Sequence, residues 1–460
     1  MAGQQSPKPV GSARGTPTTA APTGWTPAGV GGDDGAPMSP LLDDLDRRGL
    51  LHDTTDRTAL AARLGEGPIT LYYGCDPTAP SLHHGNLLGL VMLRRFQDAG
   101  HRPIALAGGA TGMIGDPGGR SEERNLLDRA TLAHNVEAIK AQIARILGPE
   151  GPWELVDNMT WTQDLLLLDF LRDVGKHVTV NQMVARESVR TRMDGEHGIS
   201  YTEFSYMLLQ ANDYAWLHQS RGCELQIGGS DQWGNILQGV DLIRRRHEGV
   251  AHGLCWPLLT GADGAKLGKS TGARLWLDPE LTSPYAFFQH WMNTDDADLA
   301  RMLAQFTLMP MPEVDALVEA HEEAPERRTG QRALALAVTG LVHGADAATA
   351  AEQASGVLFG DDPRRASAAA LEAVAAEVTA TRLEAGEALS DGVDLVPVLV
   401  RAGLAGSQSD ARRQLSQRAV AVNGEKVEAD RRLVPSDLLH GRWVLLRKGK
   451  RDWAVLDTYL

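Results

Sequence analysis

The chain of 460 residues has only three cysteines, Cys75, Cys223 and Cys255. An odd number cannot pair completely, and no two have the CxxC spacing of a thiolate zinc site, so neither a disulfide framework nor such a zinc site is expected. No run approaches about 18 apolar residues, and the N-terminus lacks the apolar region of a signal peptide. We therefore expect a protein of the reducing cytoplasm that neither spans a membrane nor is exported.

The N-terminal segment has almost no bulky aliphatic side chains and is rich in Gly, Pro, Ala, Thr and Ser. It cannot bury enough apolar surface to offset the entropy of ordering, so residues 1–39 are predicted to be a disordered tail. Met38 stands directly before SPLLDDLDRRGLL, where helical periodicity begins. Met1 and Met38 both remain open as the start of translation.

The charge of the chain is unevenly distributed. The net charge is -14, which by itself disfavours a nucleic-acid partner. Residues 395–460, however, contain twelve Lys and Arg against seven Asp and Glu, a net charge of +5, so the rest carries -19. A basic terminal module on an acidic body is the pattern expected when one domain meets RNA.

The length suggests about two to four domains, since one domain takes roughly 100 to 200 residues. An apolar strand at residues 68–73, a Gly- and Pro-containing turn, a helix with apolar residues near a 3.6 period and a second strand at 103–109 indicate the start of a parallel sheet. Residues 120–200 read as a helical insertion. A helix at about 202–219 and a strand at 224–228 then return to the sheet, beyond whose strand ends ligands bind.

The last third has two further parts. After LWLDPE the chain is rich in Ala and Leu and is predicted to be helical to about residue 375. A final module begins near Asp394 and combines helix-like segments, a turn at Asn423 and Gly424 and the strand-like WVLLRKGKRDWAVL. The predicted fold class is thus α/β, followed by an α-helical domain and a small α+β domain.

Four polar segments carry the chemistry. They are YYGCDPTAPSLHHGN (72–86), GGATGMIGDPGG (108–119), QIGGSDQWGN (226–235) and KLGKS (266–270). In the first, His83 and Asn86 stand where a strand gives way to a helix, whose N-terminal N-H groups and dipole favour the phosphates of ATP. In the last, Lys266 and Lys269 lie on a Gly-containing loop that can close over a triphosphate and neutralise the leaving pyrophosphate.

Two other groups of side chains point to a polar ligand. Tyr206, Gln210 and Asp213 are spaced i, i+4 and i+7, so they share one helix face, with Ser200 and Glu203 as a capping box ahead of them. The second group follows the strand at 224–228, where two glycines allow close backbone approach to a ligand. Each group also has a purely structural interpretation, namely a solvated helix face and an ordinary strand-to-helix cap.

In this order and spacing the four segments resemble the signature set of bacterial tyrosyl-tRNA synthetases, class I enzymes, over about residue 40 to the end. The resemblance implies a Rossmann-like catalytic domain at 40–275 that includes the insertion, a helical anticodon-binding domain at 276–385 and an S4-like RNA-binding domain at 390–460. It implies ATP with Mg²⁺ as substrate, L-tyrosine and tRNA(Tyr) as partners, no protein-bound metal or organic cofactor, and a homodimer with the insertion at its interface.

The resemblance also implies roles for individual residues. The residues expected to act in catalysis are Thr78, His83, Asn86, Lys266 and Lys269. Tyrosine binding falls to Asp116, Tyr206 and Gln210 at the ammonium group and to Tyr72 and Asp213 at the phenolic hydroxyl. ATP binding falls to Asp76, His83, Asn86, Gly229, Asp231, Gln232 and Lys269. Arg120 and Arg124 stand where the family has mobile basic residues.

Two positions depart from the family pattern. The motif usually reads HxGH, and Asn86 takes its last place; an Asn amide can donate a hydrogen bond much as a neutral imidazole does. Cys75 stands where Phe is usual, which, with Asn212, leaves open whether this is a housekeeping enzyme or a second, inhibitor-resistant copy. Alternative functions are an RNA-binding scaffold that has lost aminoacylation and a tryptophanyl enzyme. Intact HHGN and KLGKS disfavour the first, and Tyr72 with Asp213 disfavours the second.

Overall fold

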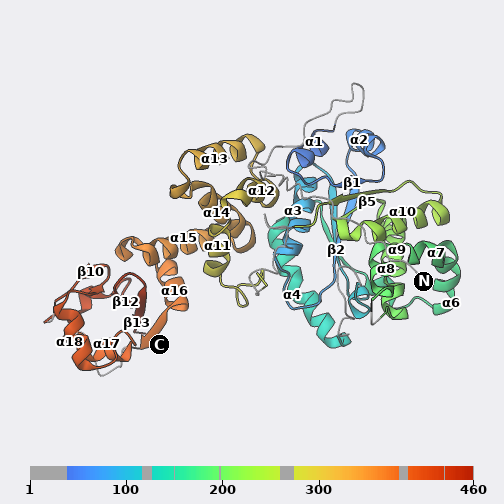
Figure 1. Ribbon diagram of the computed structural model, residues 1–460. Coiled ribbons are helices and arrows are strands. Elements are labelled where there is room, and N and C mark those ends of the chain that lie inside the picture. The colour runs from blue at the N-terminus through green and yellow to red at the C-terminus, as the bar shows by residue number, and fades with distance from the viewer. Residues whose placement is uncertain are drawn as a thin grey trace, which may run out of the picture.

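The structure, a computed structural model, describes residues 39–116, 127–149, 151–195, 198–259, 274–382, 392–428 and 430–458. Nearly all of the predicted tail, the KLGKS segment with Lys266 and Lys269, and Arg120 and Arg124 lie outside these residues. Figure 1 shows three regions in a row: a sheet with helices on both faces, a group of helices, and a C-terminal region at the far end.

The first region is built on a six-stranded sheet with the order β1-β6-β5-β2-β3-β4. Its strands are β1 (Asp53–Thr54), β2 (Thr70–Cys75), β3 (Arg102–Ala107), β4 (Glu154–Asp157), β5 (Cys223–Gly229) and β6 (His252–Trp256). All neighbouring pairs are parallel except β1 with β6. The predicted strands are thus confirmed with small shifts at their ends, and so is the α/β class with its Rossmann-like core.

Helices cover both faces of this sheet. Figure 1 shows α3 (His84–Asp98) and α4 (Arg129–Leu147) on one side of β2, and α9 (Tyr201–Arg221) and α10 (Trp233–His247) on the other. The predicted apolar side chains of α3, from Leu87 to Phe96, are fully buried in the main core. Because helices cover a parallel sheet on both faces, the sequences of its strands are nearly continuous apolar runs and do not alternate between apolar and polar residues.

The segment at 120–200 differs from the helical insertion that the sequence predicts. It contains β4, which joins the main sheet beside β3, together with α4 and four short helices. These are α5 (Met159–Thr162), α6 (Leu167–Asp173), α7 (Val180–Val184) and α8 (Glu187–Met193). The strand is four residues long and half-exposed, so it has no strong apolar pattern by which it could be recognised.

Six helices follow, as predicted from the Ala- and Leu-rich sequence. They are α11 (Pro284–Met292), α12 (Asp296–Phe306), α13 (Met311–Glu323), α14 (Thr329–His343), α15 (Ala345–Phe359) and α16 (Ala368–Glu377). Two buried arginines join them to the first region: Arg48, after α1 (Pro40–Arg47), and Arg95 on α3 both donate to the carbonyl of Ala304. A helix C-terminus leaves such carbonyls without partners inside the helix, so the arginines satisfy them.

The C-terminal region contains a five-stranded sheet, β10-β9-β12-β13-β7. Its elements are β7 (Thr379–Arg382), β8 (Val393–Asp394), α17 (Leu395–Arg401), α18 (Gln408–Ser416), β9 (Val420–Val422), β10 (Glu425–Lys426), β11 (Arg432–Leu433), β12 (Trp443–Lys448) and β13 (Asp452–Asp457). The turn predicted at Asn423 and Gly424 joins β9 to β10, with positive φ at both residues. The sheet also takes in β7, which precedes the predicted start of this domain and pairs with β13.

The C-terminal region and the helices share a core. Leu371 and Val374 of α16 belong to one apolar cluster with Trp443, Leu445 and Val455 of the sheet. This packing fixes the sheet against the end of the helical region. Of the helices in the described ranges, none is long and apolar enough to cross a membrane.

Candidate active site

A pocket opens at the carboxyl ends of β2 and β5, where ligands bind in open α/β sheets. Its lining combines aromatic rings with amide and carboxyl groups. The residues are Tyr72, Tyr73, Gly74, Asp76, Leu106, Thr111, Tyr206, Gln210, Asp213, Gln226, Ile227, Gly228 and Gln232. Six of the residues assigned to the site by resemblance therefore meet in one cavity.

The closed end of the pocket is formed by Tyr72 and Asp213, both almost fully buried. The Tyr72 hydroxyl has no hydrogen-bond partner in the part of the chain that the structure describes. Burial first, and then the charge of Asp213, raise the pKa of Tyr72 well above its usual value, so this phenol stays neutral and can donate. Burying a hydroxyl without a hydrogen-bond partner costs free energy. This indicates that a polar group of the ligand supplies the missing hydrogen bond.

Asp213 is held by two donors that the sequence did not single out. Asn158 donates from Nδ2 to one carboxylate oxygen over 2.9 Å, and Trp161 donates from Nε1 to the other over 2.8 Å. Burial raises the pKa of Asp213 to about 7, helped by the charges of Asp76 and Asp157, whereas the two donors act in the opposite direction. The carboxylate is thus fixed in place and poised to change protonation near neutral pH.

Asp76 lies on the wall of the pocket. Its carboxylate accepts hydrogen bonds from the Tyr206 hydroxyl over 2.9 Å and from Thr111 Oγ1 over 2.7 Å. Gly108, just after β3, must lack a side chain, because a Cβ there would lie 2.2 Å from an oxygen of Asp76. Thr111 belongs to the second polar segment but was assigned no role from the sequence, and Asn158 donates to it as well.

The polar wall continues across to α10. Gln232 donates to Asp116 over 2.6 Å, and Asn235 donates to both Gln210 and Gln232. Tyr206, Gln210 and Asp213 line the same pocket, so the predicted shared face of α9 is confirmed. The predicted capping box is only half present: Ser200 accepts from the backbone of Glu203, but the Glu203 carboxylate pairs instead with buried Arg192 over 2.8 Å.

His83 and Asn86 lie at the start of α3, as the strand-turn-helix pattern predicts. His83 is the N-cap residue and accepts from the backbone of Gly85, while Asn86 Oδ1 accepts from the His83 backbone N-H over 3.2 Å. Residues 274–277, which come soon after KLGKS in the sequence, run beside them: His84 donates to the Leu275 carbonyl, and Leu277 donates to that of Leu82. The site's helix end and the chain just beyond KLGKS are therefore adjacent.

Thr78, Gly229 and Asp231, which the resemblance assigns to catalysis and ATP binding, are not among the residues that line the pocket. Thr78 is exposed and its backbone N-H is bonded to the Asp76 carbonyl. Asp231 is exposed in the 3-10 turn that follows β5, next to half-buried Gly229. Lys266 and Lys269 lie outside the described residues, so the structure leaves their predicted place at the site as a prediction.

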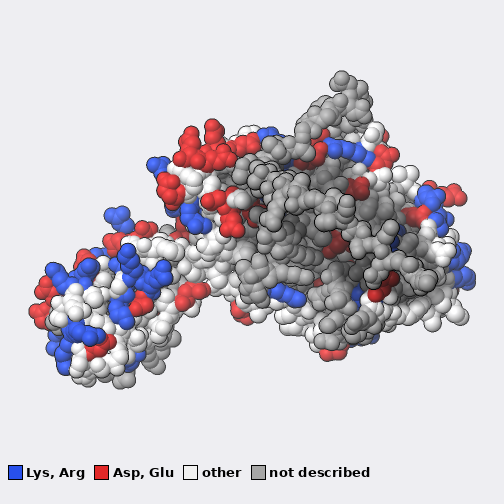
Figure 2. Space-filling view, in the orientation of Figure 1, with Lys and Arg blue, Asp and Glu red and all other residues white. Residues whose placement is uncertain are grey.

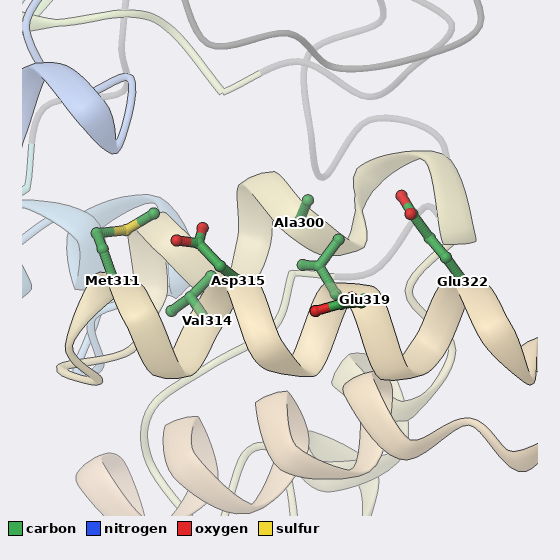
Figure 3. A pocket seen from close by; sticks show the side chains of 7 residues that line it. Ala300, Met311, Val314, Asp315, Glu319 and Glu322 are labelled. Atoms are coloured by element: carbon green, nitrogen blue, oxygen red, sulfur yellow. The ribbon is translucent and has the colours of Figure 1, made fainter.

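A second hollow lies between α12 and α13 (Figure 3), and no described residue of the four polar segments lines it. Three carboxylates, those of Asp315, Glu319 and Glu322, line it beside apolar side chains. Such a set of charges repels phosphate groups, so this hollow does not suit a nucleotide. Asp315 is in addition ion-paired with Arg47 of α1.

Comparison with known proteins identifies the family of this chain. A family model described as tRNA synthetases class I (W and Y) matches residues 64–360, and one described as tyrosine–tRNA ligase SYY-like C-terminal domain matches residues 371–456. Tyrosine–tRNA ligase of Opitutus terrae is 50% identical over 420 residues, which cover 90% of this chain and 99% of that protein. Tyrosine–tRNA ligase of Mycobacterium tuberculosis is 50% identical over 424 residues, 91% and 98% of the two chains.

Among solved structures, a C-terminally truncated mitochondrial tyrosyl-tRNA synthetase of Aspergillus nidulans superposes with a TM-score of 0.63 at 31% identity. The match covers 69% of this chain and 94% of that one. Together, the family models and relatives span both the sheet-based region and the C-terminal region. This chain therefore belongs to the tyrosine–tRNA ligase family of class I tRNA synthetases.

Proposed function

We propose that this chain activates L-tyrosine with ATP, giving tyrosyl-adenylate and pyrophosphate, and then transfers the tyrosyl group to the 3' end of tRNA(Tyr). The observation that carries the choice of amino acid is the buried Tyr72 hydroxyl, which faces Asp213 and has no partner within the described ranges. The phenolic hydroxyl of the substrate tyrosine accepts a hydrogen bond from the Tyr72 hydroxyl and donates one to the Asp213 carboxylate, so both side chains gain a partner.

Phenylalanine is rejected by the same pair. It would leave the buried Tyr72 phenol without a partner and would take from the Asp213 carboxylate the hydrogen bond that the substrate hydroxyl donates, which costs far more than the loss of a methylene group would. Tyrosine-selective synthetases are the standard example of this kind of discrimination. Asn158 and Trp161 already donate to Asp213, so they cannot supply the additional hydrogen bond that the tyrosine hydroxyl would make.

The ammonium group of tyrosine binds at the opposite, open end of the tyrosine pocket. Tyr206, Gln210 and Asp116 surround it, with Asp76 behind Tyr206. The hydrogen bonds from Gln232 and Asn235 keep Asp116 and Gln210 in place. This leaves the tyrosine carboxylate pointing toward the start of α3.

ATP, bound with Mg²⁺ as substrate, lies between the N-terminus of α3 and the turn after β5. His83, Asn86 and Thr78 address the triphosphate, in a variant of the HxGH motif, while Gly229, Asp231 and Gln232 contact the ribose and α-phosphate. The tyrosine carboxylate attacks the α-phosphate in line and pyrophosphate leaves, with Lys266 and Lys269 neutralising its charge. No side chain forms a covalent intermediate, so catalysis rests on positioning and charge stabilisation.

The C-terminal region binds the tRNA. Figure 2 shows Lys and Arg gathered over this region, whereas acidic side chains prevail over α13. Arg412, Lys426, Lys450 and Arg451 are exposed, and no acidic partner lies within ion-pair distance of them in the described part of the chain. Exposed cations of this kind suit the phosphates of a long RNA.

A homodimer forms through the segment around α6. Leu166, Leu167 and Leu168 expose 68%, 70% and 78% of their surface, although such side chains are usually buried. Phe170, further along the same helix, packs against two apolar clusters, whereas these three leucines belong to none of the clusters. A second copy of the chain would cover these leucines.

Replacing Leu167 and Leu168 by Ser should convert the dimer to a monomer in sedimentation velocity. The control is Phe359→Ser, which removes an aromatic ring that is 81% exposed at another place on the surface, and it should leave the dimer intact.

Three buried free thiols, those of Cys75, Cys223 and Cys255, support a location in the reducing cytoplasm.

The function itself is tested by amino-acid-dependent exchange of pyrophosphate into ATP across all twenty amino acids. We expect exchange with tyrosine and almost none with phenylalanine. Exchange with tryptophan would indicate the tryptophanyl alternative, and no exchange with any amino acid would indicate the RNA-binding scaffold.

A further inference from the structure

The segment at residues 275–277, soon after KLGKS, is fixed against the turn that precedes α3. Trp276 forms an isolated antiparallel bridge with His83, flanked by two backbone hydrogen bonds between residues 275–277 and 82–84. The backbone N-H of Trp276 also donates to Thr282 Oγ1 over 3.1 Å. Several backbone contacts therefore hold Trp276 at the N-terminus of α3, so its side chain has a defined place beside the site.

The indole ring of Trp276 contacts a cation that the sequence did not single out. The Arg274 guanidinium lies over this ring, 5.5 Å from its centroid, and the His83 ring lies 6.3 Å from the same indole, centroid to centroid. Arg274 is exposed and forms no ion pair with a carboxylate in the described part of the chain. A guanidinium that stacks on an indole keeps its charge and the N-H donors at its edge, so Arg274 can still bind an anion.

Of the described residues assigned to catalysis and ATP, none carries a positive charge. His83 Nδ1 accepts from the backbone N-H of Gly85 over 3.1 Å, so the imidazole has its proton on Nε2 and is neutral. Gly85 leaves room for this ring, because a Cβ there would lie 2.9 Å from His83 Cε1. Asp76 and Asp231 are acidic and repel a triphosphate unless cations balance them. The Arg274 guanidinium is such a cation, and the fold brings it to this end of the site.

We infer that Arg274 binds the β- and γ-phosphates of ATP, the part that leaves as pyrophosphate, and that Trp276 holds its guanidinium near the N-terminus of α3. The inference rests on the proposed function, because it takes ATP to lie at this helix end. A phosphate there meets both the positive end of the helix dipole and a guanidinium, and both attract it. Arg274 is thus a phosphate-binding residue, whereas Trp276 is a positioning residue that acts through Arg274.

The first test removes the charge in the full-length protein. Arg274→Gln keeps a long polar side chain, and in tyrosine-dependent exchange we expect the KM for ATP and the KM for pyrophosphate each to rise roughly tenfold, as for the loss of a hydrogen bond to a charged group. The Kd for tyrosine and the melting temperature should stay at parental values, because Arg274 is exposed and does not line the tyrosine pocket. Arg274→Lys should recover part of the loss, since it restores the charge without the planar guanidinium.

The matched control is Arg102→Gln. Arg102 is also exposed, but it lies at the first residue of β3, at the opposite end of the strand from the pocket. This variant should leave all four values at the parental level. Parental KM values for ATP and pyrophosphate in Arg274→Gln would overturn the inference. So would a lower melting temperature together with weaker tyrosine binding, because these would indicate a structural role.

A double-mutant cycle tests the part played by Trp276. Trp276→Leu removes the ring on which the guanidinium lies, so it should raise the KM for ATP in the parent but change it little when Arg274→Gln is already present. Additive effects of the two substitutions would contradict the role given to Trp276. If the parent itself showed no tyrosine-dependent exchange, the proposed function would fail together with the inference, and this outcome differs from all the others.

Discussion

Trp161 donates a hydrogen bond from its indole Nε1 to Asp213, and Trp216 holds that indole in place by stacking on it with ring centroids 4.1 Å apart and planes 12° apart. Arg221 lies over the Trp216 ring in turn, 5.4 Å from its centroid. The acceptor for the substrate hydroxyl is therefore oriented by a donor that cannot rotate away. An acceptor fixed in this way loses little entropy when the ligand binds.

Removing this donor should shift the pH dependence of tyrosine binding. The phenol of tyrosine donates best to ionised Asp213, whose pKa is about 7, so we expect tyrosine affinity to fall as the pH drops below about 7. Trp161→Phe removes a bond that favours the charged carboxylate, so the pKa rises and the midpoint of the profile moves to higher pH. At pH 7.5 the Kd should increase roughly tenfold, within the range for hydrogen bonds to charged groups.

Equilibrium dialysis of tyrosine from pH 6 to 9 measures this profile. Trp216→Phe serves as the control, because it retains the Trp161 donor and an aromatic partner for stacking. A Trp161→Phe profile that coincides with the parental one would show that the indole does not tune Asp213.

Tyr72→Phe should narrow the preference for tyrosine over phenylalanine. When phenylalanine is bound, the Tyr72 hydroxyl stays buried without a hydrogen-bond partner, and the substitution removes this hydroxyl. Phenylalanine should therefore bind with a smaller free-energy cost, whereas the substrate tyrosine loses one hydrogen bond. The ratio of kcat/KM for the two amino acids in the exchange assay gives the answer. Tyr214→Phe is a suitable comparison: that ring lies 5.3 Å from Tyr72, but its hydroxyl is bonded to the His252 carbonyl. Unchanged selectivity in Tyr72→Phe would mean that Tyr72 does not read the substrate phenol.

Arg192→Ala should destabilise the fold strongly. Arg192 and Glu203 expose only 4% and 1% of their side chains and pair over 2.8 Å, so the change leaves a buried carboxylate without its partner. Breaking such a pair costs about 3 to 5 kcal/mol. The melting temperature measures the loss, and adding Glu203→Gln should restore part of it because the uncompensated charge is gone. Arg172→Ala, at an exposed pair with Asp173, should leave the melting temperature unchanged.

Truncation should separate amino-acid activation from tRNA charging. A chain ending at residue 360, where the match to the synthetase family model ends, should retain tyrosine-dependent exchange, because the pocket lies wholly in the first region. Its charging of tRNA should fall steeply with the loss of the basic region, and each lost phosphate contact should flatten the salt dependence of tRNA affinity by about one unit of log-log slope. Parental charging and salt slope would show that RNA binds elsewhere.

The position of the cut also matters. A chain ending at residue 391 keeps α16 and β7 but removes the sheet that covers Leu371 and Val374 and pairs with β7. We expect this longer chain to aggregate more readily than the chain ending at 360, since it exposes an apolar face and an unpaired strand edge. Light scattering at equal concentration compares the two.

Local patterns in the sequence predicted much of this protein. The strand, turn and helix from β2 through α3 follow from an apolar run, a Gly- and Pro-containing turn and a 3.6 period, and the structure differs only at their ends. The shared face of Tyr206, Gln210 and Asp213 follows from helical geometry alone. Short or half-exposed elements escaped this reasoning: β4 has four residues without a clear alternation, and β7 follows a helix without any turn signal.

The sequence by itself determined which chemical groups are available and on which local element each one lies: a phenol on a strand, a carboxylate on a helix, an Asn at a helix N-terminus. Only the tertiary structure decided their environment. Asn158 and Trp161 reach Asp213 from more than 50 positions away in the chain, and the Tyr73 ring lies against Gly89 only because β2 packs against α3. The protonation and orientation of a buried polar group depend on its burial and on the donors packed around it, and these come from segments that only the fold brings together.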